Sequence, residues 1–231
     1  MKQSFGDQTL WGALQARARR VPAAPLVTYY DLATGERIEL SAVSVENAVA
    51  KTAGLLRDEL DVQPGDTVAV RLPLHWQRAV WQAACSAVAA RYEPAAEPLT
   101  AHTLVTDRDH LDLAGLATET VIVSLAPFGL PSAEPLPAGI VDHASAARAH
   151  PDVFIASADP GPEPLMQEAA ALIFSQGRLE ADRMLVLEDD PHADLLILAV
   201  PLRLHGAAVI VRHAAGGDVE AVAAAERVTA R

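Results

Sequence analysis

Residues 26–94 decide the predicted fold: they read LVTYYDLATGERIEL, then SAVSVENAVAKTAGLLRDEL, then DVQPGDTVAVRL, then PLHWQRAVWQAACSAVAARYEP. The first block predicts a hairpin, because two strand-like runs flank a turn in which Gly35 can adopt a positive φ. The second block predicts a helix capped by Ser41 or Ser44, since its apolar residues recur at helical spacing. The last two blocks predict a strand at 67–72 and a helix at 73–90.

The alternation of strand-like and helix-like segments continues through the rest of the chain. Strands alternating with helices predict an α/β fold with a parallel-rich sheet flanked by helices. We expect a single domain over residues 1–231, and the proline-rich DPGPEP at 159–164 is where a subdomain break would fall. Strand-like runs lie at 102–106, 120–125, 170–174, 183–187 and 207–212, and helix-like runs lie at 142–150, from 193 and from 218.

Composition narrows the class of protein. The chain has 231 residues, 51% of them hydrophobic, and a net charge of −12. The negative charge argues against nucleic acid or an anionic membrane as the main partner. The single cysteine, Cys85, excludes a disulfide framework and a multi-cysteine zinc site. The first twenty residues contain no apolar signal core, and no run of about 20 apolar residues occurs, so we expect a cytoplasmic protein.

Two stretches carry a resemblance to a known family. Residues 26–94 combine a glycine hairpin, a serine-capped helix, a PGDTVAV strand entry, an LP turn and an alanine-rich helix. Residues 183–211 read RMLVLEDDPHADLLILAVPLRLHGAAVIV, with a histidine turn, an apolar helix and a GAAVIV strand. This order resembles the first part of the N-terminal domain of the adenylate-forming enzymes, the AMP-binding superfamily of acyl-CoA synthetases. The whole chain resembles a group of actinobacterial proteins with a shortened AMP-binding domain.

The resemblance implies a place for a phosphate-binding loop. In that superfamily a loop of the type S-G-T-T-G-x-P-K follows a buried strand and holds the phosphates of ATP. Here residues 170–174 would be the strand, and Ser175, Gln176, Gly177 and Arg178 would be a degenerate loop. A serine and a glycine remain, but the threonine pair, the proline and the lysine do not. Arg178 could still pair with a phosphate, so ATP or AMP is a candidate ligand; the alternative is a plain strand-to-turn connection.

Other elements of adenylation are missing from the pattern. Nothing after Val211 resembles the superfamily's motifs for adenine, magnesium and ribose or its C-terminal lysine. We therefore expect a non-catalytic relative, degenerate and shortened, that binds a small molecule or a protein, and we assign no catalytic residue. The alternative is an ATP-dependent acyl-adenylate-forming ligase, with residual activity or completed by a partner chain. A shortened domain would also expose apolar surface, which predicts a homodimer through the alanine-rich C-terminal segment.

The remaining histidine and acidic groups give weaker predictions. The resemblance would put His192 beside an acyl pocket, whereas its DDPH context also fits an exposed or capping residue. The acidic and histidine groups at 107–110 and 189–192 fit solvated turns better than metal ligands, so we predict no metal site. Cys85 fits a small buried side chain.

Overall fold

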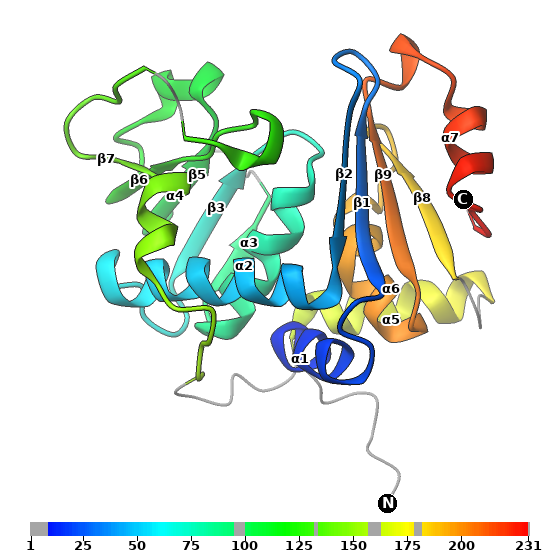
Figure 1. Ribbon diagram of the computed structural model, residues 1–231. Coiled ribbons are helices and arrows are strands. Elements are labelled where there is room, and N and C mark those ends of the chain that lie inside the picture. The colour runs from blue at the N-terminus through cyan, green and yellow to red at the C-terminus, as the bar shows by residue number, and fades with distance from the viewer. Residues whose placement is uncertain (1–8, 95–99, 132–133, 157–162, 178–181, 231) are drawn as a thin grey trace, which may run out of the picture. The chain divides into compact units, whose positions relative to one another are not determined.

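The computed structural model describes residues 9–94, 100–131, 134–156, 163–177 and 182–230, with no description of the side chain of Phe128 (Figure 1). The chain divides into two compact units. The first unit comprises Met1–Glu46, Leu74–Ala79 and Gly161–Arg231, and the second comprises Asn47–Pro73 and Val80–Pro160.

The first unit is built on a four-stranded sheet with the order β2-β1-β9-β8. β1 and β2 form an antiparallel hairpin in which Tyr29 lies opposite Ile38. β1, β9 and β8 run parallel to one another, so their carboxyl ends share one edge of the sheet. The strands are β1 (Pro25–Asp31), β2 (Glu36–Ser41), β8 (Arg183–Leu187) and β9 (Ala207–Arg212).

Helices complete the first unit. A buried π-helical turn at Leu195–Ala199 leads into α6 and packs against β9 and α5. Helix α7 lies beside β8 and β9 (Figure 1). Its Val222 packs with Leu185, Val209 and Val211. The helices are α1 (Leu10–Arg20), α5 (Pro164–Gln176), α6 (Val200–Leu204) and α7 (Val219–Ala225), with a 3₁₀ turn at Ala214–Gly216.

The second unit is built on an all-parallel five-stranded sheet with the order β4-β3-β5-β6-β7. Its strands are β3 (Thr67–Arg71), β4 (Arg91–Glu93), β5 (Thr103–Thr106), β6 (Glu119–Ile122) and β7 (Ile140–Asp142). Its helices are α2 (Ala42–Gly54), α3 (Trp76–Ala87) and α4 (His143–Ala146), and both α2 and α3 begin in the first unit. α2 continues as a π-helical turn at Leu55–Glu59. Three 3₁₀ turns lie at Arg108–Leu113, Pro127–Gly129 and Ala147–Ala149.

The predicted fold class is confirmed: strands and helices alternate, and parallel pairing dominates both sheets. Ser41 caps α2 as expected, because its hydroxyl accepts the backbone N–H of Ser44. The prediction of a break at 159–164 falls on residues of which 159–162 lie outside the described part of the chain. None of the helices among the described residues is long and apolar enough to cross a bilayer.

The predicted strand at 170–174 is wrong, because these residues lie inside helix α5. Pro164 occupies the first turn of α5, where its missing N–H costs nothing. Met166, Ala169 and Leu172 recur at helical spacing and are buried. A short apolar run reads equally well as a strand or as a buried helix segment, and the flanking residues decide between them.

Candidate functional site

The carboxyl edge of the first unit's sheet carries the candidate site. β1 ends at Asp31, β8 at Leu187 and β9 at Arg212, so the loops that follow these parallel strands meet there. In α/β sheets ligands bind outside the carboxyl ends of the strands. An open pocket of about 600 Å³ lies among these loops. We call it the edge pocket; it is lined by Leu187, Glu188, Asp189, His213, Ala214, Ala215 and Gly216.

A histidine–aspartate pair links two of these loops. Nδ1 of His213 lies 2.8 Å from Oδ1 of Asp31. The same oxygen accepts the backbone N–H groups of Ala33 and Thr34, at 2.9 and 3.2 Å. Burial alone would raise the pKa of Asp31, but the hydrogen bonds from His213 and the two backbone groups outweigh burial and lower that pKa. The carboxylate is therefore ionised at neutral pH and orients the imidazole ring.

The pair also fixes which nitrogen of His213 carries the proton. Because the Asp31 carboxylate can only accept, Nδ1 is the nitrogen that donates to it, and in the neutral tautomer Nε2 is then the hydrogen-bond acceptor. The His213 side chain is 42% exposed, so Nε2 is within reach of a ligand or solvent, whereas the Asp31 side chain is only 7% exposed. Chemically, this is an oriented proton acceptor at the rim of a pocket.

Backbone geometry holds the loop after β9 in place. His213 adopts a left-handed backbone conformation, with φ of +54°, and its N–H donates to Oε2 of Glu188 at 2.7 Å. A Cβ added at Gly216 or Gly217 would lie 3.3 Å from atoms of Leu32. The loop therefore packs closely on the β1–β2 turn, and a side chain at Gly216 or Gly217 would require Leu32 to shift by a few tenths of an ångström.

A buried histidine lies in the same unit, near this edge. His75 has no exposed surface, and its ring packs edge-on against Tyr29 with centroids 4.6 Å apart. Burial, reinforced by the charge of Arg212, lowers the pKa of His75 to about 3, so the ring is neutral. Burial and the charge of Asp31 raise the pKa of the Tyr29 hydroxyl. Both side chains thus stay uncharged at neutral pH.

The residues predicted to form a phosphate loop lie elsewhere, at the carboxyl end of α5. The hydroxyl of Ser175 donates to the carbonyl oxygen of Leu172 at 2.9 Å, and Gln176 ends the helix. Gly177 caps it in a left-handed conformation. Arg178 lies outside the described residues. A helix carboxyl end carries partial negative charge, whereas phosphates favour the amino ends of helices.

His192 is exposed, in the turn before the π-helical segment. Its backbone N–H donates to Oδ1 of Asp190 at 2.7 Å, and its carbonyl oxygen accepts the N–H groups of Leu195 and Leu196. The backbone of His192 therefore closes the turn and begins the helical segment. Its side chain is not part of the lining of the edge pocket.

The acidic and histidine group predicted at 107–110 forms a local contact. Nδ1 of His110 lies 2.6 Å from Oδ1 of Asp107, within one turn of the chain. Across the described residues, no three His, Cys, Asp or Glu side chains are placed to share a metal ion. Cys85 is buried in α3.

The sequence alone did not reveal the Asp31–His213 pair. The two residues are 182 positions apart, and each appears only as the polar residue that follows a strand. Their position at the ends of strands could have indicated the pair, because polar residues at the carboxyl ends of parallel strands gather at one edge of the sheet. Using it requires knowing that β1 and β9 are neighbours.

Comparisons with known proteins agree with this fold. No protein-family model matches the chain. An acyl-CoA synthetase from Brucella canis superposes with a TM-score of 0.73 and 15% identity, covering 96% of this chain and 46% of that one. An acetoacetyl-CoA synthetase from Streptomyces lividans gives a TM-score of 0.65 and 18% identity, covering 89% and 38%. The chain thus spans less than half the length of these synthetases and shares their fold.

One relative is much more similar in sequence. A protein of Mycobacterium tuberculosis (strain ATCC 25618 / H37Rv), described as a TIGR03089 family protein, is 41% identical over 190 residues. The match covers 77% of this chain and 78% of the relative. Identity at that level over most of both chains shows common membership: the chain belongs to the TIGR03089 protein family.

Proposed function

We propose that the protein is a non-catalytic binding protein, which holds a small molecule at the edge pocket on a scaffold of the acyl-CoA synthetase type. The observation that carries the proposal is the end of α5. Residues that would supply a strand and a phosphate loop in an adenylating enzyme are helical up to Gln176, and Gly177 terminates the helix. A helix carboxyl end presents carbonyl oxygens, which repel phosphate oxygens.

The chemistry of the edge pocket supports binding better than adenylation. Forming an acyl adenylate concentrates negative charge on phosphoryl oxygens, which cations and backbone donors must stabilise. The pocket lining contains two carboxylates, Glu188 and Asp189, one imidazole, and no lysine or arginine. These groups suit a ligand that donates hydrogen bonds, and they disfavour a triphosphate.

Pyrophosphate release tests the proposal. The purified chain is incubated with ATP, Mg²⁺ and a panel of carboxylic acids, with a full-length acyl-CoA synthetase as the positive control. We expect no release above the ATP-only background. Turnover by this chain would instead favour the competing function, an ATP-dependent ligase.

Calorimetric titration with ATP and with AMP separates the two functions further. The proposal expects no heat that depends on Ser175 or Gln176, so a double variant S175A/Q176A should behave as the unmodified chain does. Saturable nucleotide binding that this double variant abolishes would restore a phosphate site at the end of α5 and overturn the proposal.

A further inference from the structure

The edge pocket has a charge pattern that identifies its class of ligand. We propose that it binds a small organic ammonium ion with a short alkyl chain; this inference rests on the proposed function and names its ligand class. Three features carry it: a carboxylate without a partner, an oriented acceptor nitrogen and an apolar wall.

The free carboxylate is Asp189. Its side chain is exposed at the rim, and among the described residues it has no hydrogen-bond or ion-pair partner. Glu188 beside it is already engaged, since Oε2 accepts the N–H of His213 and Oε1 lies 3.8 Å from Nε of Arg212. Asp189 therefore supplies the uncompensated negative charge of the pocket.

The oriented acceptor is Nε2 of His213. The Asp31 carboxylate holds Nδ1 as the donor, so in the neutral tautomer Nε2 presents a lone pair at a side chain that is 42% exposed. An ammonium group has three N–H donors and no acceptor. It can therefore donate to Nε2 and to the Asp189 carboxylate at once, whereas a carboxylate group has no donor for either.

The rest of the pocket accounts for the alkyl chain and for the kind of cation. Leu187, Ala214 and Ala215 provide apolar surface without a charged group. The described residues place no three His, Cys, Asp or Glu side chains to share a metal ion, so the donors here are too few to replace a metal's hydration shell. The net charge of −12 adds a long-range attraction for cations of either kind.

The test uses three probes that share a four-carbon chain: n-butylammonium, n-butyrate and 1-butanol. Each is titrated into the ¹⁵N-labelled full-length chain, and amide shifts are followed by NMR. We expect saturable shifts for n-butylammonium, confined to residues 187–189 and 213–216, with millimolar affinity that weakens as salt is added. Butyrate is expected to give no shifts there, and butanol weaker ones.

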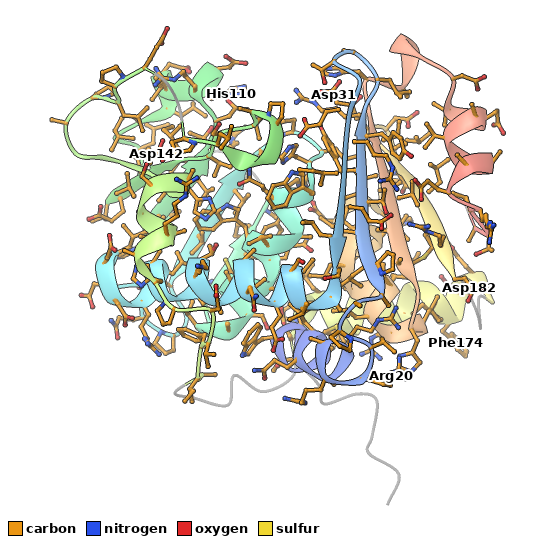
Figure 2. The ribbon with its side chains drawn as sticks, in the orientation of Figure 1. Arg20, Asp31, His110, Asp142, Phe174 and Asp182 are labelled. Atoms are coloured by element: carbon orange, nitrogen blue, oxygen red, sulfur yellow. The ribbon has the colours of Figure 1, made fainter. Side chains whose placement is uncertain are left out.

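Matched variants locate the charge. Asp189→Asn should weaken n-butylammonium binding about three- to fivefold, as expected for an exposed ion pair. His213→Asn keeps a residue that tolerates the left-handed backbone and should weaken binding by a similar factor. Asp182→Asn is the control, since Asp182 is an exposed acid just before the amino end of β8, at the opposite end of the sheet from Asp31 (Figure 2). It should leave the affinity unchanged.

The outcomes separate the inference from the proposed function. If butyrate or butanol shifts the edge-pocket amides and n-butylammonium does not, the ligand class is wrong while small-molecule binding stands. If Asp182→Asn weakens binding as much as Asp189→Asn, the weakening comes from the net charge of the protein rather than from the edge pocket, and the inference fails. If none of the probes moves these amides, the edge pocket is not a binding site and both fail.

Discussion

Glu226 holds the end of α7 to the sheet of the first unit, and its removal gives a measurable loss of stability. Its carboxylate, 6% exposed, accepts the hydroxyl of Tyr30 at 2.6 Å. It also accepts Nη2 of Arg37 at 2.8 Å and pairs with Nη1 of Arg183 at 2.9 Å. Three donors from three strands thus converge on one carboxylate, and Glu226→Ala would leave all three without it.

The expected cost follows from how buried each partner is. Removing one partner of a buried charge pair costs about 3–5 kcal/mol. Arg37 and Arg183 keep 45% and 23% exposure, so water compensates part of the loss. We therefore expect about 2–3 kcal/mol, which corresponds to a fall in Tm of roughly 4–12 °C for a chain of this length. Since the chain has two units, the loss should appear in the unfolding of the first unit.

Urea denaturation, with amide hydrogen exchange on α7 and β2, measures this loss. Glu168→Ala is the matched control, because Glu168 is an exposed acid on α5, where a change of less than about 0.5 kcal/mol is expected. If Glu226→Ala and Glu168→Ala cost the same within error, the network does not stabilise the unit and the reasoning is refuted.

The pH dependence of the same variant gives a second readout. Burial alone would raise the pKa of Glu226, but hydrogen bonds from Tyr30 and Arg37 and the charges of Arg183 and Arg37 lower it below 4.5. A lowered folded-state pKa stabilises the protein above the unfolded value and loses that effect as pH falls through the folded value. The difference between wild type and Glu226→Ala should therefore shrink below about pH 4.5.

Three further predictions concern other parts of the chain. His75 has its pKa lowered to about 3, so its contribution to stability should fall as pH drops below 6.5, by about 2 kcal/mol from pH 7.5 to pH 5. Burial lowers the pKa of His143 to about 4, which adds a slope over the same range, so His75→Phe should remove only the His75 part in urea titrations; an unchanged slope would count against it. Gly54→Ala places a Cβ 2.8 Å from the ring of His150, which is hydrogen-bonded to Glu59, and should lower the free energy of unfolding by about 1–3 kcal/mol. In a His150→Ala background the same change should be neutral or stabilising, because the clash is gone and alanine favours the helix. An equal loss in both backgrounds would exclude the clash. Light scattering at micromolar concentration should give twice the 24.4 kDa chain mass if the expected homodimer forms, and the monomer mass would refute it.

Local patterns predicted most of the strands and helices. The β1–β2 hairpin follows from two short β-like runs around Gly35, and α2 follows from Val45, Val49 and Ala53, all buried as their spacing required. The helix α1 was not predicted, although Thr9 caps it by accepting the N–H of Gly12. Its large apolar residues, Leu10, Trp11 and Leu14, lie close together among polar and basic residues, so the helical periodicity of this segment is short.

The candidate site was less predictable, because it depends on strand order. A β-like run does not specify which strand lies beside it, so Asp31 and His213 could not be paired from periodicity alone. The strand expected at 170–174, ahead of the proposed phosphate loop, is instead part of a helix that begins at Pro164 and is capped by Gly177. A proline at the start and a glycine at the end of a segment therefore indicate its structure more strongly than a short apolar run does.

The pairing of β1 with β9 has a consequence for how the chain is made. Val27 pairs with Ala208, so one edge of β1 has no partner until about 180 further residues have been synthesised. At 5–20 residues per second that interval is roughly 10–40 s. All five strands of the second unit leave the ribosome within it. The nascent chain therefore carries an open strand edge while its middle can already fold, and a chain stalled before residue 207 never closes that edge.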